Sequence, residues 1–352
     1  VAAVVNVARR DGVKRAVKWG VVALILIFLG SALRSAWATI AGHHWQIAWP
    51  VLGGGFLFLL GQELSFGFIW RVILGRMGYR LPWRICLRIF LAAEFVRYIP
   101  GNVWHVLTRV IWAEREGVPK SFGLASMTVE LATRIAAGVL TFAVSLIWWP
   151  DLTRLGSGLG HFASLALVIV GVPLLILGLH PRVLQWGLNL ALRALKRKSI
   201  TLTLTYGDIL AVVGAWTASW IIGGVGFWLA VLAVTPAGLS LSTMFIAIGI
   251  YAMGWTIGFL SFVTPSGLFF REAVVALLLS LSGVVPNIAI AGVVAVLASR
   301  LMPTLAELLC VGWAYWATRR HHMPARQALV AVPDQILQQS HIRVRATRVR
   351  HP

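Results

Sequence analysis

The feature of this sequence that most restricts its fold is a series of apolar runs about 20 residues long. A helix needs roughly that length to cross a hydrocarbon core of about 30 Å at 1.5 Å per residue. The last two of the eight candidate runs are short and meet at Met302 and Pro303, so one kinked helix or a thin hairpin is an alternative to two full spans there. The runs cover residues 17–39, 48–74, 121–149, 158–179, 206–233, 241–263, 286–302 and 304–318. The chain is therefore expected to be an all-α polytopic membrane protein with about eight transmembrane helices.

Composition supports this class and argues against others. The 352 residues are 59% hydrophobic and 12% charged, whereas a soluble domain is about 45–50% apolar and roughly a quarter charged. The formal charge of +20 would also suit a nucleic-acid-binding protein, but the apolar content argues against that partner. The only two cysteines, Cys86 and Cys310, lie far apart in sequence, and no metal, ATP-binding or dinucleotide motif is present. We therefore expect no cofactor and no metal.

The distribution of Lys and Arg predicts the orientation. Basic residues collect in the first 18 residues, in 76–88, in 182–198 and after residue 319, whereas the connections 40–47, 150–157 and 234–240 carry almost none. Loops rich in Lys and Arg stay in the cytoplasm. Both termini are therefore expected to be cytoplasmic, with a membrane domain at residues 1–320 and a basic cytoplasmic tail at 321–352.

Two segments do not read as plain spans. Residues 82–118 are interrupted between Tyr98 and Asn102, and residues 264–284 begin at Thr264 with a Pro-Ser-Gly sequence that leads into a helix at about 268–282. That helix would be only about 22 Å long, which is short for a crossing. We expect both segments to be re-entrant or broken-helix elements that enter from the cytoplasmic side.

The two broken segments also resemble each other. In the first element, at about 82–149, a Gly-Val-Pro turn at Pro119 precedes a span that carries Arg134. In the second, at about 264–318, a Gly-Val-Val-Pro turn at Pro286 precedes a span that carries Arg300. Internal repeats around broken helices are typical of transporters, whose binding site lies between the repeats. The span count makes the repeats parallel, and an inverted pair would require one broken element to cross fully.

Charged residues within the apolar segments are the second indication of a site. Placing one at a helix centre costs at least about 2.5–3.5 kcal/mol, so such residues usually line a cavity or pair with one another. Glu130 and Arg134 stand four residues apart on one helical face, which would allow a structural ion pair. The acids in question are Glu63, Glu94, Glu130, Glu272 and Glu307, and the arginines are Arg97, Arg109, Arg134, Arg271 and Arg300. Arginine together with half-helix N-termini would suit a phosphate group.

These observations define a candidate substrate site and no catalytic residue. For His105, a hydrogen-bonded core residue is the alternative to a ligand. The tryptophans of the chain, Trp148 and Trp313 among them, are interpreted as anchors at the membrane interfaces. The candidate substrate-binding residues are Arg97, Asn102, His105, Arg109, Glu130, Arg134, Arg271, Glu272 and Arg300.

Several of these residues carry a family resemblance. The run from Arg97 to Asn102, Arg109 downstream, the Val129-Glu130 pair, and the run from Pro265 to Ala273 resemble the lysylphosphatidylglycerol synthase transmembrane family, also called the flippase-like family. The resemblance extends from about residue 15 to 320. In the second motif, however, this chain has Ser and Phe at positions where the family usually has glycine. No soluble synthase-like domain follows the membrane part in this sequence.

The resemblance implies a prokaryotic plasma membrane protein that moves a polar-headed lipid: an aminoacylated or anionic phospholipid, or a lipid-linked saccharide. Its partners would be membrane lipids, with a separate lipid-modifying enzyme and a second copy of the chain as further candidates. An intramembrane glycosyltransferase using a polyprenyl-phosphate sugar is an alternative, but it would need a carboxylate base near the outer face, and only Asp151 lies in an outer loop. A non-catalytic membrane scaffold is the third hypothesis.

Overall fold

The computed structural model describes residues 41–96, 104–150, 167–194, 204–235, 240–261 and 267–319, together with residues 34 and 37. Every regular element in these ranges is a helix. The chain divides into two compact units, Val1–Gln46 and Ile47–Pro352. In the first unit, the ring of His43 packs edge-on against Trp45, with 4.6 Å between their centroids. All helices discussed below belong to the second unit.

Among the described residues of this unit, five helices are long and apolar enough to cross a membrane, or six if one bent pair counts as a span. The bent pair is α7 (Val172–Gly178) and α8 (Pro181–Ala194), which follow the short helical turn η3 (Leu167–Gly171) and meet at 59°. The five are α2 (Trp49–Arg76), α5 (Lys120–Ser145) with η1 (Leu146–Trp148), α9 (Tyr206–Val234), α10 (Leu241–Leu260), and one helix made of α12 (Ile288–Val296), η5 (Leu297–Leu301) and α13 (Met302–Arg319). The described residues thus contain fewer candidate spans than the eight predicted. The span expected at 17–39 lies outside the described residues.

The last two predicted spans form this one continuous helix. Pro303 has no N–H to donate to the carbonyl of Ser299, a loss that ends or kinks an ordinary α-helix. Here the five-residue π-helical turn η5 stands directly before it, and such a turn absorbs the irregularity without ending the helix. Of the alternatives that the sequence left open here, the structure therefore shows one continuous helix.

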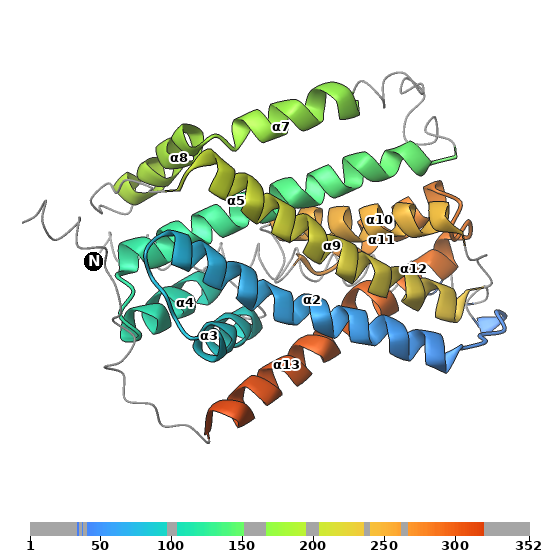
Figure 1. Ribbon diagram of the computed structural model, residues 1–352. Helices are drawn as coiled ribbons and strands as arrows, with labels where there is room; N and C mark the ends of the chain where they lie inside the picture. The colour runs from blue at the N-terminus through green and yellow to red at the C-terminus, as the bar shows by residue number, and fades with distance from the viewer. Residues whose placement is uncertain are drawn as a thin grey trace, which may run out of the picture. The chain divides into compact units, whose positions relative to one another are not determined.

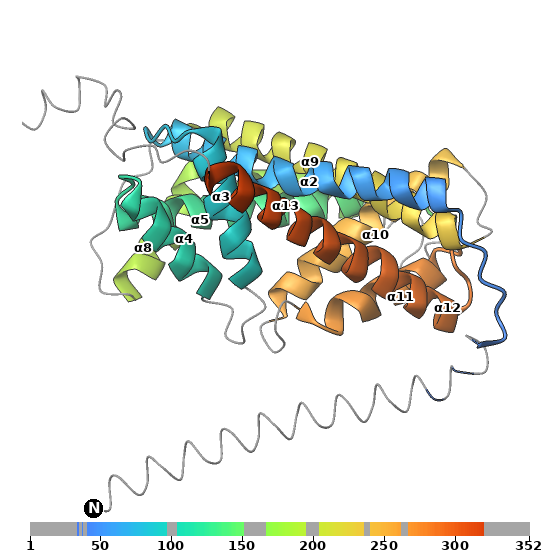
Figure 2. The ribbon, with the colours of Figure 1, turned by 90° about the horizontal axis from the view of Figure 1, so that it is seen from below.

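Helices α2 and α9 run side by side along the length of the bundle (Figures 1 and 2). Their closest approach is at two glycines: a Cβ on Gly55 would lie 2.8 Å from the carbonyl oxygen of Gly226, and a Cβ on Gly226 would lie 2.7 Å from that of Gly55. Such small residues let the backbones of membrane helices approach closely. Helices α5 and α10 pack against α9 and against each other.

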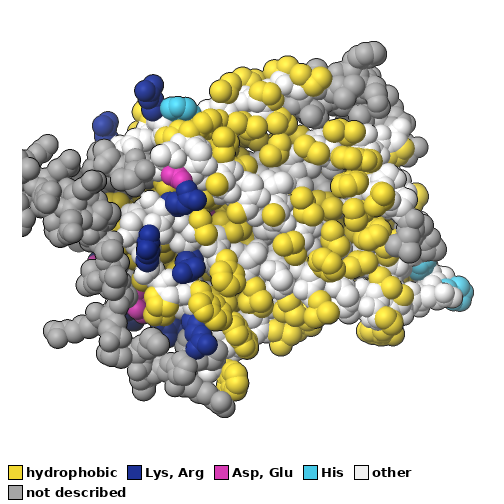
Figure 3. Space-filling view, viewed as in Figure 1, with side chains coloured by type: hydrophobic (Ala, Val, Ile, Leu, Met, Phe, Trp, Pro, Cys, Tyr) yellow, Lys and Arg dark blue, Asp and Glu magenta, His cyan; other side chains and the backbone are white. Residues whose placement is uncertain are grey.

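The bundle has one end rich in basic side chains, here called the basic end. Arg76, at the end of α2, forms an ion pair with Asp208, near the start of α9. Helix α2 therefore ends at the basic end, and α9 begins there. Figure 3 shows the Lys and Arg side chains gathered at this end, while the rest of the visible face is mostly apolar. Its exposed basic residues are Arg76, Arg80, Arg84, Arg115, Lys120, Arg182 and Arg193. The described parts of two predicted basic regions, 76–88 and 182–194, therefore lie at the same end, and the assignment of that end to the cytoplasm remains a prediction.

The first broken segment forms two short helices, α3 (Trp83–Val96) and α4 (Trp104–Arg115), of 14 and 12 residues. At 1.5 Å per residue they measure about 21 and 18 Å, too short for a crossing. Helix α3 begins beside Arg84 and α4 ends at Arg115, both exposed at the basic end. The interruption itself lies in 97–103, outside the described residues, and with it Arg97 and Asn102 of the predicted site.

The second broken segment contains α11 (Phe270–Leu281), close to the predicted helix at 268–282. Helix α11 packs against α12, the first part of the long helix that ends with α13. At its other end this long helix reaches the basic end, where Trp313 of α13 stacks on Trp83 with 6.1 Å between the ring centroids. Helix α11 thus runs toward the end opposite the basic one (Figure 1). The prediction that this segment is a re-entrant or broken-helix element that enters from the cytoplasmic side stays a prediction. The internal repeat remains a prediction.

Candidate functional site

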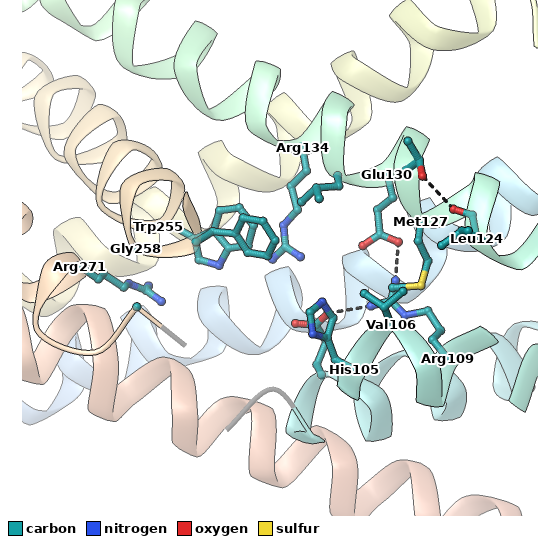
Figure 4. A pocket seen from close by; sticks show the side chains of 15 residues that line it. His105, Val106, Arg109, Leu124, Met127, Glu130, Arg134, Trp255, Gly258 and Arg271 are labelled. Atoms are coloured by element: carbon teal, nitrogen blue, oxygen red, sulfur yellow. Dashed lines mark hydrogen bonds and ion pairs between the residues drawn. The ribbon is translucent and has the colours of Figure 1, made fainter. Parts of the chain in front are cut away.

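A cavity of about 180 Å³ lies where the two broken segments meet α5 and α10 (Figure 4). Helices α3 and α4 line it from one side, and Gly267 with the first turn of α11 from the other. Five of the nine predicted site residues line this cavity. They are His105, Arg109, Glu130, Arg134 and Arg271.

Arg109 holds three helices together at one end of the cavity. Its Nη2 donates to Oε1 of Glu94 on α3 at 2.7 Å, and its Nη1 donates to Oε2 of Glu130 on α5 at 2.5 Å. The arginine side chain is 1% exposed, and its guanidinium carbon lies 4.0 Å from the ring centroid of Phe90. A buried charge network of this kind is costly to break, because removing one partner leaves another charge uncompensated. We refer to Glu94, Arg109 and Glu130 as the carboxylate end of the cavity.

Arg134 is surrounded by aromatic rings. Its guanidinium carbon lies 3.9 Å from the ring centroid of Trp255 and 4.1 Å from that of Phe66. Trp216 and Trp220 add rings at 4.9 and 5.7 Å, and the indole N–H of Trp220 donates to the backbone oxygen of Arg134 at 3.2 Å. Ring faces attract a cation electrostatically, so these four residues hold the guanidinium in place. They are named the aromatic box.

The spacing of Glu130 and Arg134 pointed to an ion pair between them, and in the structure both side chains also have other neighbours. The Glu130 carboxylate accepts from Arg109 on the neighbouring helix, and the Arg134 guanidinium lies among the rings. Figure 4 shows the Arg134 guanidinium beside Trp255, with Arg271 on the far side of that ring. Arg134 and Arg271 thus approach the cavity from two sides of Trp255.

Arg271 is positioned by tight packing at the start of α11. A Cβ on Gly267, whose φ is +65°, would lie 2.2 Å from the carbonyl oxygen of Gly258 on α10, so only glycine fits there. The backbone N–H of Phe269 donates to Oε2 of Glu272 at 2.7 Å, which caps the first turn of the helix. Arg271 itself is 6% exposed, and its guanidinium carbon lies 5.5 Å from the ring centroid of Tyr251.

Two predicted site residues do not line the cavity. Nε of Arg300 donates to Oε1 of Glu272 at 2.7 Å, an ion pair that joins η5 to α11. Adjacent helical residues point about 100° apart, so when Arg271 faces the cavity Glu272 faces elsewhere. Glu272 and Arg300 thus lie outside the described lining of the cavity, and their role in substrate binding stays a prediction.

Sequence reasoning missed the aromatic part of the site. The tryptophans were interpreted as interfacial anchors, but Trp216 and Trp220 are 0% and 1% exposed, and Trp255 lines the cavity. The four-residue spacing of Trp216 and Trp220 does place both on one face of α9. That signal could have indicated a buried aromatic surface, although not the arginine that it surrounds.

The described lining of the cavity contains three arginines and two glutamates, an excess of one positive charge with histidine neutral. Guanidinium groups suit phosphate and carboxylate oxygens, which they can bind with two parallel N–H donors. Within the described ranges, no three His, Cys, Asp or Glu side chains are grouped as a metal site requires. The cavity is thus chemically suited to an anion.

Comparison with known proteins adds one finding. Residues 15–307 match the family described as "Lysylphosphatidylglycerol synthase TM region". The match includes every residue that lines the cavity. No curated protein and no solved structure matches the chain.

Proposed function

This chain belongs to the lysylphosphatidylglycerol synthase transmembrane family, and from that premise we propose that it moves a lipid with a phosphate-bearing head group across the membrane. The observation that carries the proposal is the cavity at the meeting point of the broken helices, where Arg134 and Arg271 face the same space. In this proposal the head-group phosphate binds in the cavity that both guanidinium groups line. The acyl chains remain in the bilayer.

The physical problem that such a protein solves is the desolvation of a charge. A phosphate that leaves water for hydrocarbon loses hydrogen bonds that nothing in the lipid core replaces. Arginines inside a protein cavity supply substitute donors and an opposite charge. The volume of about 180 Å³ is below the roughly 300–1,000 Å³ of pockets that enclose whole ligands, which favours binding of a head group alone.

Translocation makes and breaks no covalent bond, so the proposal assigns binding residues and no catalytic residue. Aminoacylated phospholipids, anionic phospholipids and lipid-linked saccharides all carry a phosphate, and each fits the proposal. A separate lipid-modifying enzyme in the plasma membrane of a prokaryote would supply the substrate. Mass spectrometry of the lipid that stays bound through gentle purification would distinguish these classes.

The test uses the full chain reconstituted in vesicles that contain a fluorescent phosphatidylglycerol, with dithionite added outside to measure how fast the label changes leaflet. Arg271→Gln removes a charged hydrogen-bond donor worth about 1.5–3 kcal/mol, so the rate should fall by about tenfold or more. Arg271→Lys should restore only part of the rate, because the planar fork is lost. Arg115→Gln, an exposed change on α4, is the control and should translocate normally.

A well-folded Arg271→Gln variant that translocates at the parental rate would contradict the proposal. Folding is checked separately by size-exclusion chromatography and thermal melting in detergent. If the variant expresses poorly, Arg271→Lys still provides the test, because it keeps the charge and changes only the donor geometry.

A further inference from the structure

Helix α8 lies at the basic end and begins beside the first residue of the span α9. His180, immediately before α8, packs its ring 5.5 Å from that of Tyr206, the residue at which α9 begins. The Tyr206 hydroxyl also donates to the backbone oxygen of Ile176 on α7 at 2.7 Å. At this junction the chain bends by 59°. Helix α8 therefore begins where the spans leave the apolar region and continues in a different direction from α7.

One face of α8 is apolar and exposed. Val183, Trp186 and Leu190 are 50%, 68% and 55% exposed, whereas Leu188 is fully buried against the bundle. Spacings of three and four residues place the three exposed side chains in one stripe. Trp is also the residue that favours the head-group level of a bilayer. A short helix with this pattern is typical of one that lies in the plane of the membrane interface.

The charged residues beside this apolar stripe indicate which kind of membrane surface α8 would bind. Arg182 and Arg193 are both exposed, and successive turns of 100° per residue place them next to the stripe on the same side. Both Figures 1 and 2 show α8 at the end of the bundle that carries α4, and the exposed basic residues gather at that end (Figure 3). A leaflet that contains anionic lipids attracts such basic groups.

We propose that α8 is an interfacial anchor for an anionic lipid leaflet. Val183, Trp186 and Leu190 insert among the head groups and upper acyl chains, and Arg182 and Arg193 bind lipid phosphates at the edge of the helix. The anchor is separate from the cavity, and it stands whether or not the chain translocates lipid. It would hold the basic end at the membrane surface through a contact that does not depend on the spans.

The test is a depth measurement on the full chain in nanodiscs, either of phosphatidylcholine alone or of phosphatidylcholine with phosphatidylglycerol. Cys86 and Cys310, both buried, are replaced by Ala, Trp186→Cys is spin-labelled, and the accessibility of the label to oxygen and to a water-soluble nickel chelate is compared. Leu190→Cys provides a second position if the first variant folds poorly. Glu114→Cys, 46% exposed on α4, is the aqueous control.

The label at 186 should be more accessible to oxygen than to nickel, and phosphatidylglycerol should increase that preference. Arg182→Gln with Arg193→Gln should remove most of the increase, whereas Arg80→Gln with Arg84→Gln, an equal change of charge elsewhere at the basic end, should leave most of it. A label that favours nickel in both nanodiscs would overturn the proposal, since the helix would then lie in water. A label protected from both reagents would also overturn it, because a protein partner or a second copy would cover the stripe. An oxygen preference that does not respond to phosphatidylglycerol would refute the recognition of anionic lipid.

Discussion

The two ends of the cavity hold their arginines in different ways. At the carboxylate end, Arg109 donates to both Glu94 and Glu130, so most of its charge is used within the protein. In the aromatic box, Arg134 lies against rings, whose faces attract and orient the guanidinium. The comparison suggests a division of roles: the carboxylate end fixes the helices, and the aromatic box presents charge to a ligand.

The largest effect should come from breaking the carboxylate end. Arg109→Gln leaves two buried carboxylates without their shared cation and should cost about 3–5 kcal/mol. The expected result is a strong loss of folded protein and a much lower thermal midpoint in detergent. If the role is structural, the triple variant Arg109→Gln, Glu94→Gln and Glu130→Gln should recover much of the stability, because no buried charge is stranded. A well-folded single variant that has lost only translocation would reverse the assignment of roles.

The aromatic box should show the opposite behaviour. Trp255→Leu keeps an apolar side chain but removes the ring nearest to Arg134, which is worth about 1–2 kcal/mol when the cation is desolvated. We expect translocation to fall by about fivefold or more while the protein remains folded, and Trp255→Phe to recover part of the rate. The matched control is Phe259→Leu, which removes a ring that stacks on Trp255 at 5.2 Å. Equal losses of rate in both variants would mean that packing, not the contact with Arg134, controls the site.

The sequence allowed the prediction of some of this arrangement and not the rest, for physical reasons. Pro265 and Gly283 are local signals, and they located the helix now seen as α11 to within two residues at its start and one at its end. Pro303 is also a local signal, but it left both two spans and one kinked helix open, and η5 carries the helix through it. The aromatic box combines rings from α2, α9 and α10 around a side chain of α5. No periodicity within one segment can indicate which distant ring lies against which arginine.

The pair that joins Glu272 to Arg300 should have an intermediate effect on stability. Its side chains are 13% and 12% exposed, so solvent screens them more than Arg109, and a charged hydrogen bond of this kind contributes about 1.5–3 kcal/mol. Arg300→Gln should lower the thermal midpoint moderately and reduce translocation less than Arg271→Gln does. A double-mutant cycle with Glu272→Gln measures the coupling. Translocation lost as completely as in Arg271→Gln would support a place for Glu272 and Arg300 in the binding site.

The smallest effect is expected for an ion pair of arginine and a carboxylate that lies at the surface. Arg76 is 49% exposed where it meets Asp208, and exposed ion pairs contribute at most about 1 kcal/mol because water and salt screen them. Asp208 has a second role, since its carboxylate accepts from the backbone N–H of Thr205 at 3.0 Å and so caps α9. Asp208→Ala should therefore lower the thermal midpoint more than Arg76→Ala, and the coupling in the double-mutant cycle should shrink further at high salt. If the coupling of Arg76 with Asp208 were as large as that of Arg109 with its glutamates, burial would not explain why ion pairs at the carboxylate end contribute more to stability than other ion pairs.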